Sequence, residues 1–129
     1  MYFALRYAMG QPPFQHTAET NTWRNAVVQQ LTAEALKQQA KRQNELILLA
    51  FPLPDTPARA TQFANRLGAL LDAVPQPPEW GADRMQVIYS AGELRFLLCI
   101  EWLCDAMWLE PAGGIASNTD TLWQHINSK

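Results

Sequence analysis

Apolar residues dominate the stretch over residues 90–110, and this feature constrains the fold more than any other. Ser90 and Glu93 have the spacing of a capping box, in which each side chain accepts a hydrogen bond from a backbone N–H at the start of a helix. Pro111 follows the run where a helix would have to end, because proline cannot continue one. On a helical wheel the apolar side chains go almost all the way round, which is typical of a buried helix. The stretch therefore predicts a central core helix over residues 90–110.

Two other structures are open to this stretch. A membrane-spanning helix needs about 20 apolar residues, but Glu101 and Asp105 near its middle would make insertion costly. A β-hairpin over Met85–Trp102, turning at Ala91-Gly92, is the stronger alternative, because short apolar runs fit a strand as well as a helix. We expect the core helix, with Glu101 and Asp105 on its solvated strip.

A long helical pattern precedes this stretch. Residues 21–51 carry an apolar stripe at helical spacing, and prolines follow directly after residue 51. The stripe is interrupted by polar residues, Gln38 and Arg42 among them. A break near Thr32, where a second helix could begin, is the alternative. We expect one continuous helix with a polar middle.

Two further helices have clearer start signals. Asp55-Thr56-Pro57 is an N-cap followed by proline in the first turn, where the missing N–H costs nothing. One apolar stripe then runs over Pro57–Val74. A short helix near the C-terminus could be capped by Asn118, Thr119 or Asp120.

These patterns together predict a mainly α fold, a single domain over residues 1–129 in which three to four helices surround the central helix. Strand-like alternation in Tyr2–Met9 and in Met85–Tyr89 allows a minor two-stranded β element as well. The apolar fraction of 48% is ordinary for a globular domain of this length.

The cysteines and the N-terminus indicate a location. Cys99 and Cys104 both fall in the apolar stretch, where we expect reduced, buried packing residues, and their helical spacing does not suit a mutual disulfide. The opening MYFALRYAMG lacks the charged start and long apolar core of a signal peptide. We expect a cytoplasmic protein.

No catalytic pattern stands out. Glu101 and Asp105 could bind a divalent metal, but no histidine shares a motif with them. Cys99 or Cys104 could act as a nucleophile with His125 as base, yet an apolar, acidic setting does not activate a thiol. The HExxH, CxxC, EF-hand and GxGxxG patterns are absent. We therefore expect no catalytic residue, no metal and no cofactor, and we keep a metal- or thiol-dependent enzyme only as the third hypothesis.

A small basic cluster supports a second hypothesis. Lys37, Lys41 and Arg42 lie close together in the predicted long helix and could contact nucleic-acid phosphates. The net charge of −2 and the acidic second half of the chain oppose that role. A small DNA-binding regulator is the alternative function.

The first hypothesis is a helical protein–protein interaction module: an adaptor, accessory subunit or regulator that binds another protein or a second copy of itself. It follows from the absence of catalytic motifs and from a surplus of apolar surface. Gln38 and Arg42 are candidate contact residues in the polar gap of the long helix. Trp80 in the proline-rich connection and Trp123 near the C-terminus are the others, because tryptophan is enriched in interface hot spots.

Overall fold

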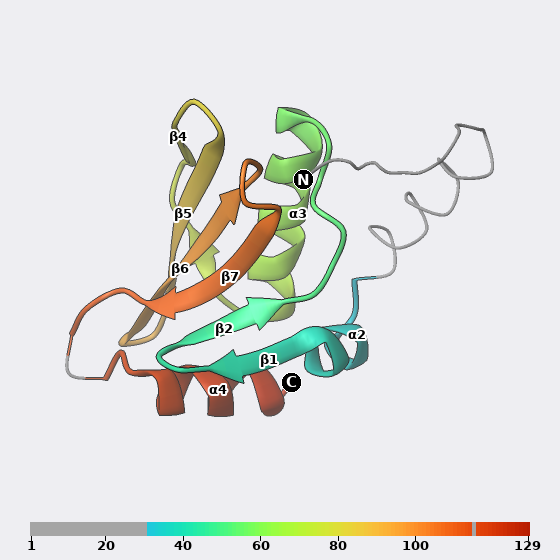
Figure 1. The fold of residues 1–129 in the computed structure, drawn as a ribbon. Helices are drawn as coiled ribbons and strands as arrows, with labels where there is room; N and C mark the ends of the chain where they lie inside the picture. Colours follow the sequence, from blue (N-terminus) through green and yellow to red (C-terminus); the bar gives the residue numbers. More distant parts are fainter. Residues whose placement is uncertain (1–30, 115) are drawn as a thin grey trace.

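An antiparallel sheet with helices on one face forms the body of the molecule (Figure 1). The computed structural model describes residues 31–114 and 116–129. The helices are α2 (Ala33–Gln39), α3 (Pro57–Leu70) and α4 (Thr119–Asn127). The strands are β1 (Ala40–Gln43), β2 (Leu46–Leu49), β3 (Val74–Pro75), β4 (Glu79–Trp80), β5 (Arg84–Ala91), β6 (Leu94–Glu101) and β7 (Ala106–Pro111).

The sheet has seven strands in the order β1-β2-β7-β6-β5-β3, and β4 also pairs with β5. All pairings are antiparallel. Strands β5, β6 and β7 form a meander that follows the chain. The β1–β2 hairpin, from much earlier in the sequence, joins this meander along β7.

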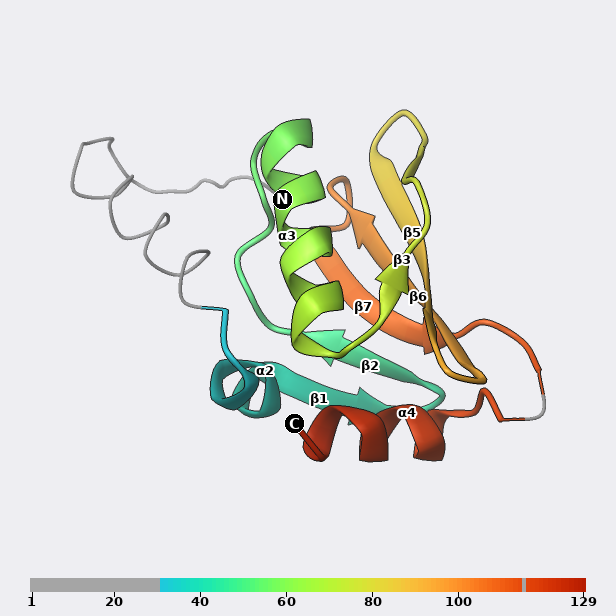
Figure 2. The ribbon, with the colours of Figure 1, turned by 180° about the vertical axis from the view of Figure 1, so that it is seen from behind.

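One face of the sheet carries the core. Side chains alternate between the two faces of a strand, and the buried set of β5, Met85, Val87 and Tyr89, points to the helices. Helix α3 packs on this face, where the Tyr89 hydroxyl donates to the Ala64 carbonyl at 2.7 Å. Helix α4 lies beside the end of α3, with His125 Nε2 2.7 Å from the Leu71 carbonyl oxygen. Figure 2 shows α3 and α4 on this same side of the sheet.

The prediction of a mainly α bundle around a central helix over residues 90–110 is wrong. That stretch contributes the end of β5, all of β6 and most of β7. The hairpin alternative over Met85–Trp102 is confirmed: β5 pairs with β6 from Arg84↔Glu101 to Ala91↔Leu94. The turn places Gly92 at a φ of 62°, a left-handed conformation that glycine adopts without strain. Ser90 and Glu93 therefore form no capping box.

The physical reason is that both faces of these strands carry apolar side chains. Leu97 and Trp108 face away from the helices, while Leu98 and Leu109 face toward them. The alternation that marks a half-buried strand is therefore missing from the sequence. Glu101 and Asp105 do not share a helix face, because Glu101 ends β6 and Asp105 lies in the turn that follows, at a φ of 51°.

The prediction of one continuous helix over residues 21–51 is also wrong. In the described part of that range, only Ala33–Gln39 is helical. Thr32 is its N-cap and accepts a hydrogen bond from the Ala35 N–H at 3.1 Å, so a helix begins where the alternative interpretation placed the start of a second helix. The chain then forms the β1–β2 hairpin, in which Asn44 takes a φ of 57°. Asparagine tolerates that left-handed turn conformation well.

The other two helices are confirmed. Thr56 caps α3 by accepting from the Arg59 N–H, and Pro57 occupies the first turn. Asn118 caps α4 by accepting from the Thr121 N–H at 2.8 Å. Residues 2–9 lie outside the described residues, and Met85–Tyr89 belongs to the large sheet. Among the described helices, none is long and apolar enough to cross a membrane.

Candidate functional site

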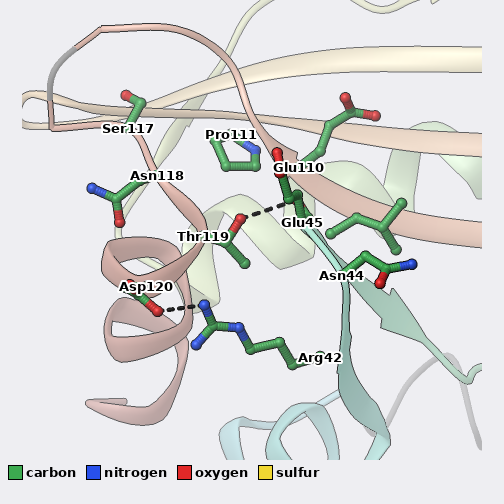
Figure 3. A pocket seen from close by; sticks show the side chains of 10 residues that line it. Arg42, Asn44, Glu45, Glu110, Pro111, Ser117, Asn118, Thr119 and Asp120 are labelled. Carbon is green, nitrogen blue, oxygen red and sulfur yellow. Dashed lines mark hydrogen bonds and ion pairs between the residues drawn. The ribbon is translucent and has the colours of Figure 1, made fainter.

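A polar hollow of about 730 Å³ lies where the β1–β2 turn, the end of β7 and the start of α4 meet (Figure 3). Arg42 forms an ion pair with Asp120 across it. The Thr119 hydroxyl donates to the Glu45 carbonyl oxygen at 3.0 Å. Both contacts join α4 to the β1–β2 hairpin. Because these groups already have partners, they hold two elements together rather than await a ligand.

A smaller hollow of about 320 Å³ lies at the start of α3, beside the β4–β5 connection. Two tryptophans line it. The Trp102 indole N–H donates to the Pro54 carbonyl oxygen at 2.7 Å, which fixes that ring, whereas Trp80 is 48% exposed. Two carboxylates and one cation line it, from Asp55, Asp83 and Arg84, and Asp55 forms an ion pair with Arg59 at 3.3 Å.

A third candidate surface is the sheet face turned away from α3 and α4, which we call the open face. Helix α2 lies at the β1 edge beside α4, and no described helix crosses this face (Figure 1, Figure 2). The side chains that it presents are Lys41 and Gln43 from β1; Leu46 and Leu48 from β2; Ala106, Trp108 and Glu110 from β7; Arg95, Leu97, Cys99 and Glu101 from β6; and Arg84, Gln86, Ile88 and Ser90 from β5.

An apolar patch occupies the middle of the open face. It consists of five half-buried side chains: Leu46, Leu48, Ile88, Leu97 and Trp108. The strand register makes them neighbours. Leu48 is opposite Trp108, and Ile88 is opposite Leu97. A contiguous apolar surface of this kind marks a contact site more often than scattered apolar residues do.

Three polar groups are built into this patch. The Trp108 indole N–H donates to Glu110 Oε1 at 2.7 Å, and the Cys99 thiol donates to the same oxygen at 3.5 Å. The Gln86 amide donates to Cys99 Sγ at 3.8 Å. Burial, followed by the charge of Glu110, raises the pKa of Cys99 to about 12. Cys99 is therefore a protonated, unreactive thiol at neutral pH.

The four candidate contact residues do not form one site. Arg42 lines the larger hollow and Trp80 the smaller one. Gln38 is exposed on α2, and Trp123 is half-buried on α4 against the core. None of the four lies on the open face.

The basic cluster is divided by the fold. Lys37 lies in the last turn of α2. Lys41 and Arg42 are neighbours on β1, and successive strand residues point to opposite faces. Arg42 faces α4, where Asp120 neutralises it. The DNA-binding hypothesis stays untested, but its three side chains share no surface.

The thiol and metal hypotheses find no assembled group in the part of the chain that the structure describes. Cys99 faces the open side of the sheet, whereas His125 lies on α4, on the other side. Cys104 is exposed, contrary to the prediction of a buried residue, and a hydrogen bond to Glu101 raises its pKa. No three His, Cys, Asp or Glu side chains gather there in a way that could hold a metal ion.

The sequence interpretation missed the open face because it placed these residues in a helix. The hairpin alternative contained the necessary signal. A turn at Ala91-Gly92 puts Arg84, Gln86, Ile88 and Ser90 on the same face as Arg95, Leu97, Cys99 and Glu101. No protein-family model, curated protein or solved structure was found to match this chain.

Proposed function

We propose that this protein is a non-catalytic protein–protein interaction module that binds its partner on the open face of the sheet. The proposed binding surface is one face of a β-sheet, not the helical surface that the sequence predicted. The observation that carries the proposal is the apolar patch: five half-buried side chains on a sheet face that no described helix covers.

The two faces of the sheet differ in how much apolar surface they leave exposed to water. Tyr89, Phe96 and Leu98 on the helix side are fully buried. Side chains of similar size on the open face, such as Leu97 and Trp108, keep part of their surface in water. Covering apolar surface contributes about 25 cal/mol per Å². A partner that covers the patch gains that free energy, and α3 and α4 are already committed to the other face.

The polar groups in the patch fit recognition rather than chemistry. Glu110 is held by Trp108 and Cys99 in one orientation. A fixed carboxylate inside an apolar surface selects partners that bring a hydrogen-bond donor to it, because an unpaired buried charge is costly.

A pull-down with two matched lysine variants tests the proposal. The tagged full-length chain is captured from its native host as wild type, Leu97→Lys and Gln62→Lys, and co-purifying proteins are quantified. Lysine at Leu97 stays solvated on a free face but is buried without a counter-charge under a partner. Gln62 is exposed on α3, outside the open face, and serves as the control.

We expect a stoichiometric protein species, either a second copy or another polypeptide, with wild type and Gln62→Lys. Leu97→Lys should lose it while its thermal unfolding midpoint stays within a few degrees of wild type. The same species with all three chains, or none with wild type, contradicts the proposal.

A further inference from the structure

A straight line of paired residues divides the open face into two halves. Val87, Leu98 and Leu109 are direct partners across β5, β6 and β7, and Ile47 of β2 continues the line. These four side chains point into the core, so no open-face side chain lies on the line itself. In each strand, the open-face residues nearest the line are one position before and one position after the residue that lies on it.

The charges at the two ends of β6 are complementary across this line. Along β6 the open face carries Arg95, Leu97, Cys99 and Glu101: a cation, a leucine, a thiol that is 2% exposed, and an anion. Read in the opposite direction, the anion comes first and the cation last. Two such strands stacked antiparallel therefore place unlike charges opposite each other at both ends.

We infer that the open face binds a second copy of this chain, face to face about a twofold axis along the Val87–Ile47 line. The inference rests on the proposed function and names its partner. Rotation about such an axis reverses the strand direction and keeps each strand above its own copy. The interface is isologous, as in most homodimers.

The rotation places apolar side chains over each other on β2, Trp108 over the Glu110 carboxylate of the second copy on β7, and unlike charges over each other at the two ends of β6. Leu46 lies over Leu48 of the second copy, and Leu97 lies over Cys99 of the second copy. Arg95 lies over Glu101 of the second copy, and the symmetry creates this ion pair twice. Ile88 lies over the aliphatic part of Gln86 of the second copy.

Known sheet geometry accommodates this arrangement. Packed sheets lie about 10 Å apart, with their strands rotated by about 30°. At the ends of β6, about 10 Å from the axis, that rotation displaces facing residues by about 5 Å. The long Arg95 side chain spans such a displacement, and Arg95 is exposed.

The two rim charges cannot pair within one chain. Arg95 and Glu101 are six residues apart on the same extended strand, which separates them by about 20 Å. Within the described part of the chain, the structure gives the Arg95 guanidinium no ion pair. Glu101 also lies opposite Arg84 of its own chain in the β5–β6 pairing. Recovery of dimerisation in the double variant, rather than the loss in either single variant, therefore reports on contact between two molecules.

Sedimentation velocity of the purified full-length chain, from low micromolar to about 100 µM, tests this inference. The proteins compared are wild type, Arg95→Glu, Glu101→Arg, the double variant carrying both changes, and Glu93→Arg. Glu93 is exposed in the β5–β6 turn, so Glu93→Arg repeats the charge change of Glu101→Arg outside the face. Circular dichroism confirms that each variant is folded.

We expect wild type and Glu93→Arg to dimerise with increasing concentration. Each single variant places like charges together twice and weakens dimerisation about tenfold or more. The double variant restores unlike pairs and recovers dimerisation to within about threefold of wild type.

A wild-type monomer at all concentrations overturns the inference, and so does a dimer whose affinity none of the variants changes. If Leu97→Lys still abolishes capture of a different polypeptide, the proposed function survives and only the identity of its partner is wrong. If residues 1–30 of the same chain cover the face, sedimentation gives a monomer and the pull-down captures no polypeptide. That result overturns the proposed function and the homodimer.

Discussion

The two cysteines show how the fold sets residue chemistry. Cys99 is 2% exposed within the sheet, and Cys104 is exposed in the turn that follows β6. Only the thiolate is nucleophilic. Burial raises the pKa of Cys99 to about 12, so both access and ionisation protect it.

We predict that iodoacetamide at pH 8 modifies Cys104 in the native protein, while Cys99 reacts only after unfolding in urea. Tryptic mass spectrometry of samples quenched over several hours distinguishes the two sites. Native modification of Cys99 at a rate comparable to that of Cys104 would show that β6 is not packed as described.

Tyr89 makes a second residue-scale prediction. Its hydroxyl donates to the Ala64 carbonyl at 2.7 Å, and its ring stacks on Phe96 with centroids 5.0 Å apart. Near neutral pH, Tyr89→Phe should cost about 1 kcal/mol of unfolding free energy, the usual value of one hydrogen bond.

Burial raises the pKa of Tyr89 well above that of a free tyrosine. An unfolded tyrosine loses its proton near pH 10, while the folded one keeps it. Stability from this group is therefore full below pH 10 and falls as the pH rises further. Urea unfolding should show that the difference in unfolding free energy between wild type and Tyr89→Phe is smaller at pH 11 than at pH 8. An equal difference at both pH values would contradict the burial of Tyr89.

At the scale of elements, α3 packs tightly against its neighbours at Gly68. A Cβ there would lie 2.9 Å from the Ala73 carbonyl oxygen and 3.1 Å from Tyr89 Cε2. Alanine is the better helix former by about 1 kcal/mol, but an overpacked core site loses about 1–3 kcal/mol.

We predict that Gly68→Ala lowers the unfolding free energy, because the backbone carbonyl cannot move aside cheaply. Asn65→Ala, at an exposed position of the same helix, is the control and should be neutral or slightly stabilising. Chemical denaturation of both variants measures the difference. A stabilised Gly68→Ala would mean that α3 lies farther from β3 and β5.

The elements that were predictable from the sequence are those with local signals. Thr56 with Pro57 and Asn118 each mark a helix start through contacts within one turn. Residues 90–110 lack such a signal, because their strands form by pairing between β5, β6 and β7 and, at β7, with β2 far away in the sequence. Their apolar side chains on both faces also hide the strand period.

The candidate site depended on the same missing information. Leu48 and Trp108 are 60 positions apart in the sequence and become neighbours only through the β2–β7 pairing. Conversely, Lys41 and Arg42 looked like one basic cluster because they are adjacent in sequence, and the strand separates them. The sequence interpretation expected a surplus of apolar surface, and the position of the apolar patch could be derived only from the sheet register.

At the scale of the whole molecule, the sheet has two unequal faces. One is closed by α3 and α4, with Tyr89, Phe96 and Leu98 fully buried. The other presents an apolar patch between Arg95 and Glu101 at opposite ends of β6. We propose that a partner covers this second face and completes the packing of the sheet.

Cysteine labelling in cells measures that coverage directly, whatever the partner. In a Cys104→Ser background, a single cysteine is placed at Leu97 on the open face or at Gln62 on α3. The labelling rate with a membrane-permeant maleimide is compared between the native host and dilute purified protein. We expect Leu97→Cys to react at least tenfold more slowly in the host than in dilute solution, and Gln62→Cys to react equally in both. Equal rates for Leu97→Cys in the two settings would mean that no partner covers the open face.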